Sequence, residues 1–313
     1  MRFENYFIDL SFRSLITQRK LAVLSAKAAK VGPVVWLTAG VHGDEIGGVV
    51  VIQEIFKRLR EQPLRRGTVC ALPLINPFGF EVATRQVPIS EEDLNRAFPG
   101  KASGTLAERI AHLISTTIMA SQPTVVLDLH NDWSRSIPYV LIDPKPRSTT
   151  AKVYDQVKLL SASLAMPVVL DSDVYQGTLS YTMLRQGVAA FSLELGESYV
   201  INEKNIEVGV KALWSVFGKL GMVESTDGER SAGEATKILH YSDEPRISSI
   251  GITRFLVKPG ETVATGQGLA EVYDVMGNLQ EKLKAKAPAL VLGHTDYSVC
   301  FPGTPLVSLG VKR

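Results

Sequence analysis

Two stretches of the sequence bring together side chains that bind metal ions. His42 and Glu45 lie three residues apart in "WLTAGVHGDEIGG", directly after an apolar run that predicts a buried strand. His130 ends a second apolar run, "PTVVLDLH". Two imidazoles and one carboxylate would hold a tetrahedral zinc ion and leave a fourth position for water, as in catalytic zinc sites. The hypothesis is therefore one zinc ion per chain, held by His42, Glu45 and His130.

A simpler interpretation exists for the first half of this pattern. In this interpretation Glu45 does no more than complement the positive end of the helix that follows it, and His42 is an incidental loop residue. The placement of the two halves argues for the metal site, because ligands of open α/β sheets bind beyond the carboxyl ends of strands. Gly40 and Gly43 would allow the backbone to turn tightly around an ion.

The first two thirds of the chain alternate segments typical of strands and of helices. The predicted strands span residues 33–40, 67–77, 123–130, 137–143 and 188–196. The predicted helices span residues 46–60, 104–120, 150–165 and 204–220. Thr105 and Glu108 have the spacing of a capping box at the start of the second helix. This alternation predicts an α/β fold with a mostly parallel or mixed sheet flanked by helices.

The sequence texture changes near residue 225. The segment "ESTDGERSAGE" is polar and rich in glycine, and short β-branched runs separated by turn signals follow it. We therefore expect a catalytic domain over residues 1–225 and a small all-β domain over residues 226–313.

Composition and charge exclude several classes of partner. The net charge of +2, with both signs interspersed, gives no electrostatic basis for binding nucleic acid or an anionic membrane. No apolar run is long enough to span a membrane, and the first residues lack the layout of a secretory signal. The two cysteines, Cys70 and Cys300, are far apart in sequence. Reduced thiols and a cytoplasmic location are the resulting expectations.

Five short motifs, in chain order, resemble those of the zinc carboxypeptidase superfamily: "AGVHGDEIGG", "INPFGFEVATR", "DLNRAFPG", "VLDLH" and "LELG". The closer resemblance is to its succinylglutamate desuccinylase/aspartoacylase branch, and it covers about residues 30–200. This resemblance implies a zinc carboxypeptidase-like fold, with the zinc ligands at His42, Glu45 and His130.

The resemblance also implies roles for four further residues. Arg85 would polarise the scissile carbonyl, Asn95 and Arg96 would bind a substrate carboxylate, and Glu194 would be the general base. Arginine suits a carboxylate because its planar fork donates two parallel hydrogen bonds. Glu194 lies in an apolar strand, where an unpaired carboxylate is costly, so it needs a partner. A structural ion pair is the alternative for Glu194, and a simple turn is the alternative for "DLNR".

Two aspartates are candidates to orient the zinc ligands. Zinc-bound histidines usually donate their other ring N–H to a carboxylate or a carbonyl. The resemblance implies that Asp93 orients His42. Asp128 precedes His130 by two residues on the same strand face and could orient that ring in the same way. Either aspartate could instead cap a loop.

The tail resembles biotinyl and lipoyl carrier domains, but "DVMGN" stands where a modifiable lysine would lie. A swinging-arm role is therefore not expected. We expect the tail to shape substrate access or to form contacts in a homo-oligomer.

These features together predict a zinc-dependent hydrolase that cleaves the amide bond of an N-acyl amino acid or a similar small N-acylated amine. One alternative is a metallocarboxypeptidase that acts on peptides or cell-wall fragments. Another is a non-catalytic zinc- or ligand-binding homologue. The sequence does not predict the identity of the acyl group, because no cationic residue stands out as the partner of a second substrate carboxylate. The unranked candidates for that role are Lys145, Arg147 and Arg185.

Overall fold

The computed structural model describes residues 1–10, 19–172, 175–224, 237–295 and 297–312. The strands of the first part are β1 Arg2–Asp9, β2 Lys20–Lys27, β3 Val34–Ala39, β4 Thr68–Leu72, β5 Val125–His130, β6 Arg135–Ser136, β7 Pro138–Ile142, β8 Val168–Leu170 and β9 Ala189–Leu195. The helices are α1 Gly47–Glu61, α2 Pro77–Val82, the 3-10 helix η1 Leu94–Arg96, α3 Leu106–Ala120, α4 Ala151–Ala162, α5 Leu179–Arg185 and α6 Glu203–Lys219. The strands of the second part are β10 Leu239–Ser242, β11 Gly251–Phe255, β12 Thr262–Val263, β13 Gly268–Tyr273, β14 Leu279–Lys284, β15 Ala289–His294, β16 Val299–Cys300 and β17 Val307–Val311.

Within the described residues, thirteen strands form one mixed sheet with the order β1-β2-β4-β3-β5-β9-β7-β8-β10-β17-β15-β12, and β6 pairs with β15. The four central strands β4, β3, β5 and β9 run parallel to one another. Strand β7 runs antiparallel to β9. The predicted fold class, a mostly parallel or mixed sheet with helices, is therefore confirmed.

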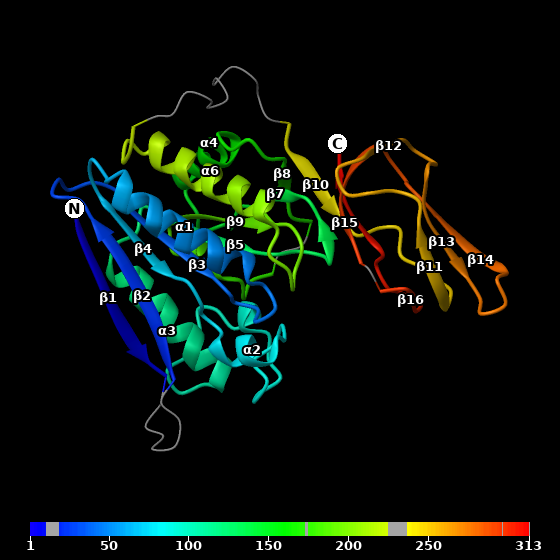
Figure 1. The fold of residues 1–313 in the computed structure, drawn as a ribbon, viewed down its shortest axis with the longest axis horizontal. Helices are drawn as coiled ribbons and strands as arrows, with labels where there is room; N and C mark the ends of the chain where they lie inside the picture. The colour runs from blue at the N-terminus through cyan, green and yellow to red at the C-terminus, as the bar shows by residue number, and fades with distance from the viewer. Residues whose placement is uncertain (11–18, 173–174, 225–236, 296, 313) are drawn as a thin grey trace.

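The centre of the sheet is covered on both faces. Every residue of β5 and of β9 is buried. Because successive side chains of a strand point to opposite faces, complete burial requires a layer on each side. Helices α1 and α6 pack against each other and against the central strands (Figure 1). The predicted helices all form within a few residues of the expected bounds, and α3 begins with the predicted Thr105–Glu108 capping box.

The strand pair at the N-terminal edge is absent from the sequence prediction. Strands β1 and β2 form an antiparallel pair that joins the sheet through β4. Most side chains of β1 are exposed, with no regular alternation between buried and exposed positions. A strand without that alternation carries no sequence signal of period two, which explains why β1 is absent from the prediction.

The C-terminal part is all-β, as predicted, and it continues the main sheet. Strand β10 pairs with β8 in parallel and with β17 in antiparallel orientation. A second sheet, with the order β14-β13-β11-β16, lies at the far end of the molecule (Figure 1). The predicted linker falls mostly on residues 225–236, which lie outside the described residues. The division into domains at residue 225 remains a prediction.

Both cysteines are free thiols, and burial raises the pKa of Cys70 to about 11. None of the described helices combines the length and the apolar character that crossing a bilayer requires.

Candidate active site

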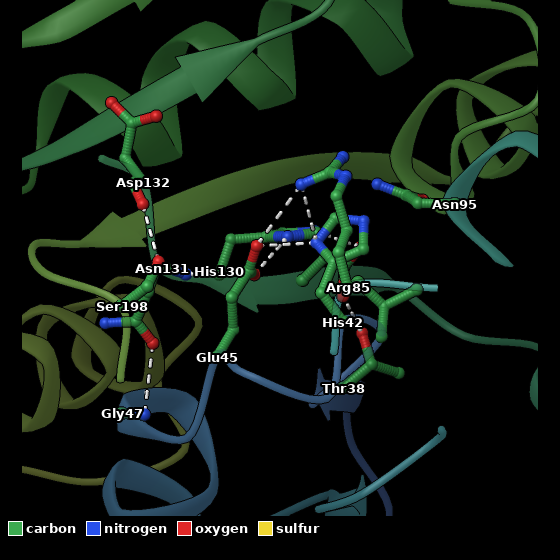
Figure 2. A network of polar contacts seen from close by, with 12 residues as sticks. Thr38, His42, Glu45, Gly47, Arg85, Asn95, His130, Asn131, Asp132 and Ser198 are labelled. Atoms are coloured by element: carbon green, nitrogen blue, oxygen red, sulfur yellow. Dashed lines mark hydrogen bonds and ion pairs between the residues drawn. The ribbon is translucent and has the colours of Figure 1, made fainter. Parts of the chain in front are cut away.

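Three predicted metal ligands meet at the carboxyl ends of β3 and β5. Nδ1 of His42 lies 2.5 Å from Oε1 of Glu45, and Nδ1 of His130 lies 3.0 Å from Oε2 of the same carboxylate. One donor atom from each residue lies within 4.8 Å of the other two, and all three side chains are buried. Figure 2 shows both contacts to the Glu45 carboxylate as dashed lines.

The opposite edge of each imidazole faces an aspartate. Nε2 of His42 lies 3.2 Å from Oδ1 of Asp93, and Nε2 of His130 lies 2.9 Å from Oδ2 of Asp128. Thr38 donates a 2.6 Å hydrogen bond to the other oxygen of Asp128. A carboxylate that accepts the Nε2 proton leaves the Nδ1 lone pair available toward the Glu45 side.

The electrostatics of this cluster favour a bound cation. Burial opposes the charged forms of the histidines, but the neighbouring carboxylates outweigh it and raise the pKa of His42 and, more strongly, of His130. The two imidazoles in turn hold the pKa of the buried Glu45 carboxyl far below its usual range. A divalent cation would replace the ring protons and give the same carboxylate a stronger partner.

The loop that carries His42 follows a path that only glycine permits. Gly40 has φ of +62°, in the left-handed region that other residues rarely adopt. A Cβ on Gly43 would lie 1.9 Å from the backbone carbon of Gly79. The close approach of these two backbones fixes the turn between β3 and α1, and with it the positions of His42 and Glu45.

Arg85 lies beside the donor cluster. Its Nε and Nη2 donate to one oxygen of Asp93 at 3.2 and 3.0 Å, and its Nη1 lies 3.3 Å from Nδ1 of His42. Nη1 also lies 3.6 Å from Oε1 of Glu45. The structure thus brings the predicted carbonyl-polarising residue to the predicted metal ligands.

Asn95 and Arg96 line the same cavity from η1. The Asn95 side-chain oxygen accepts a 3.0 Å hydrogen bond from the Leu179 backbone amide at the start of α5, and this contact fixes the orientation of the Asn95 side chain. The Arg96 guanidinium lies over the ring of Tyr175, 4.3 Å from its centroid. A cation stacked on an aromatic face keeps its in-plane N–H donors available for a planar anion.

Glu194 lies on β9, in register with His130 on β5. It is 8% exposed, and in the described part of the chain its carboxylate accepts no hydrogen bond. It lines a cavity of about 250 Å³ together with His42, Glu45, Arg85, Asn95, Arg96 and His130. One cavity therefore contains the seven predicted metal, catalytic and substrate-binding residues.

Residues 31–217 match the catalytic domain of the succinylglutamate desuccinylase/aspartoacylase family. The chain belongs to this family. A relative from Halomonas elongata, an N-alpha-acetyl-L-2,4-diaminobutyric acid deacetylase, is 29% identical over 257 residues, which are 78% of this chain and 71% of the relative. The succinylglutamate desuccinylase of Pseudomonas aeruginosa is 26% identical over 226 residues, 67% of each chain.

The fold of the succinylglutamate desuccinylase/aspartoacylase family extends over the whole chain. The product-bound ectoine utilization protein EutE (DoeB) from Ruegeria pomeroyi superposes with a TM-score of 0.85 over 99% of this chain and 95% of its own, at 21% identity. A family member from Rhodobacter sphaeroides gives 0.83 over 99% and 96%, also at 21% identity. Both superpositions include the C-terminal all-β part.

The donor set in this family member fits a zinc ion. Zinc prefers imidazole nitrogen and carboxylate oxygen at about 2.0–2.2 Å in a tetrahedron, and catalytic sites leave one position for water. His42, Glu45 and His130 supply three such donors, and Asp93 and Asp128 stand where zinc-bound imidazoles have their partners. The residues present are therefore competent to hold the ion.

Several lining residues escaped the sequence analysis. The Asn131 side-chain oxygen accepts a hydrogen bond from the Gly47 backbone amide at the start of α1, and the Asn131 backbone amide donates to Oε2 of Glu45. Asp143 and Asp171 follow the apolar runs "YVLI" and "VVL" directly. A metal-binding type of side chain at the end of an apolar run is the signal that identified His130, and the same signal applies to both aspartates.

We predict that Asp128→Asn weakens zinc binding by about 10- to 100-fold, because an amide cannot serve His130 as a carboxylate does. The measurement is zinc affinity by competition with a chelator. Thr38→Val removes the hydroxyl that holds Asp128 but leaves the carboxylate, so its effect should be smaller. An unchanged affinity in Asp128→Asn would remove the orienting role of this aspartate.

Proposed function

We propose that this protein is a zinc-dependent deacylase that hydrolyses the amide bond of a small N-acyl amino acid. The observation that carries the proposal is the convergence of His42, Glu45 and His130 in one cavity. Zinc bound there would supply Lewis acidity, which makes water acidic enough to ionise near neutral pH and polarises an amide carbonyl.

The remaining steps fall to the side chains that surround the donor cluster. Asn95 and Arg96 bind the substrate carboxylate and orient the amide. Arg85 donates hydrogen bonds to the carbonyl oxygen as negative charge develops on it. Glu194 removes a proton from the attacking water and delivers it to the leaving amine.

The environment of Glu194 suits this role when a cation is present. Burial raises the pKa of Glu194 well above its usual range, and nearby carboxylates add to the effect, while His130 opposes it. A divalent cation beside the carboxylate lowers the pKa again. The group would then be ionised to accept a proton and weakly enough acidic to release it to the amine.

A substrate panel tests the proposal. Zinc-loaded protein should hydrolyse at least one N-acetyl or N-succinyl amino acid, and treatment with a chelator should abolish the activity. Faster hydrolysis of peptides than of any acyl amino acid would support the carboxypeptidase alternative. Stoichiometric zinc without any turnover would support a binding protein.

Arg96→Ala should raise KM by about 10- to 100-fold with a smaller effect on kcat, because a hydrogen-bonded charge pair with the substrate carboxylate is lost. Arg96→Lys keeps the charge but loses the planar fork, so it should recover only part of the binding. Steady-state kinetics on the best substrate of the panel measures both. A KM equal to that of the wild type in Arg96→Ala would contradict the assignment.

A further inference from the structure

The cavity wall beyond the donor cluster is built from the ends of three neighbouring strands. Strands β7, β8 and β10 are parallel and adjacent, and Ile142 is in register with Leu170. The next residues, Asp143 and Asp171, therefore lie side by side, and the Asp171 amide donates to the Ile142 carbonyl at 3.0 Å. Asp243 follows β10, and all three aspartates line the cavity that contains the metal ligands.

The lining of this cavity carries an excess of negative charge. Six carboxylates and two guanidinium groups line it within the described residues. The two arginines are Arg85, which binds Asp93, and Arg96, which lies over Tyr175. Among the described residues, neither arginine forms an ion pair with Asp143 at the end of β7.

Asp143 is the carboxylate of this wall that lacks a cationic partner. It is 7% exposed, and in the described part of the chain no lysine, arginine or histidine forms an ion pair with it. Asp243, by contrast, is paired with Arg246 at 2.6 Å. Burial raises the pKa of Asp143 to about 7, a hydrogen bond with Ser180 opposes this shift, and the Asp171 carboxylate adds to it. A buried carboxylate in such surroundings is stabilised by a cation.

Among the described lining residues, no lysine or arginine besides Arg85 and Arg96 is available for a second substrate carboxylate. Lys145, Arg147 and Arg185, the candidates for that role, are absent from the lining of the cavity. An acidic acyl group or side chain would instead meet Asp143 and Asp171, and like charges in a buried site repel strongly.

We propose that Asp143, with Asp171 beside it, binds a protonated amino group of the substrate, so that the cavity selects N-acyl diamino acids over neutral and acidic N-acyl amino acids. This inference rests on the proposed deacylase function, because it assigns the substrate class of the same cavity. The substrate would span the site, with its carboxylate at Asn95 and Arg96 and its ammonium group at Asp143.

The test compares substrates that match in shape and differ in charge. The substrates are N-α-acetyl-L-2,4-diaminobutyrate, its neutral isostere N-acetyl-L-norvaline, and the acidic N-acetyl-L-aspartate. Wild-type protein loaded with zinc should prefer the first by at least about 30-fold in kcat/KM, as expected for a buried charge pair. Equal or faster hydrolysis of the neutral or acidic substrate would overturn the inference while leaving the deacylase function intact.

The variant Asp143→Asn tests whether Asp143 causes the preference for the positively charged substrate. This variant should reduce the preference for the diaminobutyrate derivative over the norvaline derivative to within about threefold, because the ammonium contact is lost. Asp155→Asn, at an exposed position on α4, removes the same charge outside the cavity and should retain the wild-type preference. A preference that survives in Asp143→Asn would contradict the assignment.

Binding of the free amino acids separates this inference from the catalytic proposal. By calorimetry, L-2,4-diaminobutyrate should bind the zinc-loaded protein at least about 10-fold more tightly than L-norvaline, and Asp143→Asn should remove the difference. If no acyl amino acid is hydrolysed, the proposed deacylase function is contradicted. The calorimetric comparison then still tests whether the cavity prefers a positively charged side chain. Equal affinity of the two amino acids would refute it.

Discussion

Replacing Glu194 with glutamine should lower kcat by about 10²- to 10⁴-fold while zinc stays bound, because general acid–base catalysis contributes an effect of this size. Glutamine has nearly the same shape as glutamate but cannot accept a proton. The Glu194 side chain accepts no hydrogen bond in the described part of the chain, so the substitution breaks no contact of this kind. The fold and the zinc site should therefore survive.

Three measurements on the variant separate chemistry from structure: kcat, zinc content and melting temperature. Glu207→Gln makes the same change at an exposed position on α6 and should leave all three near wild type. If Glu194→Gln kept nearly full kcat, this glutamate would not be the base. If zinc were lost together with activity, Glu194 would hold the site together instead of moving a proton.

His130→Ala should abolish stoichiometric zinc binding and lower kcat/KM by more than about 10³-fold, because the metal supplies several kcal/mol of transition-state stabilisation. The substitution removes one of three donors and also takes one buried partner from each of Asp128 and Glu45. Some loss of stability is expected as well, since two buried carboxylates lose a compensating group.

A matched histidine variant controls for the general effect of removing an imidazole. His112 lies on α3, away from the cavity, and His112→Ala should keep zinc and activity. Circular dichroism of His130→Ala tests whether the protein is still folded. A folded variant with a full complement of zinc and normal turnover would show that the ion binds elsewhere.

Most of the central sheet could be predicted from the sequence. Its strands are buried on both faces and therefore appear as apolar runs, and the helices that cover it have regular apolar spacing. Strands β3, β5 and β9 are apolar runs in the sequence, and the polar residues at or just beyond their ends indicated the active site. The convergence of His42 and His130 followed from one topological rule, that parallel strands end at the same edge of a sheet. No knowledge of side-chain contacts was needed for that step.

The parts that the sequence did not reveal depend on tertiary pairing. The sequence predicted a separate tail, but the parallel pairing of β10 with β8 joins the tail to the main sheet, and no local pattern encodes that contact. The same pairing brings Asp243, from beyond residue 225, to the lining of the cavity. The hydrogen bond from the Asn131 backbone amide to the Glu45 carboxylate likewise links residues 86 positions apart.

Anomalous X-ray diffraction at the zinc edge, on crystals of the zinc-loaded protein, tests the central claim most directly. The account predicts one strong peak per chain, bonded to Nδ1 of His42, Nδ1 of His130 and the Glu45 carboxylate at about 2.0–2.2 Å. A peak bound to other residues, or no peak in protein with full turnover, would contradict it.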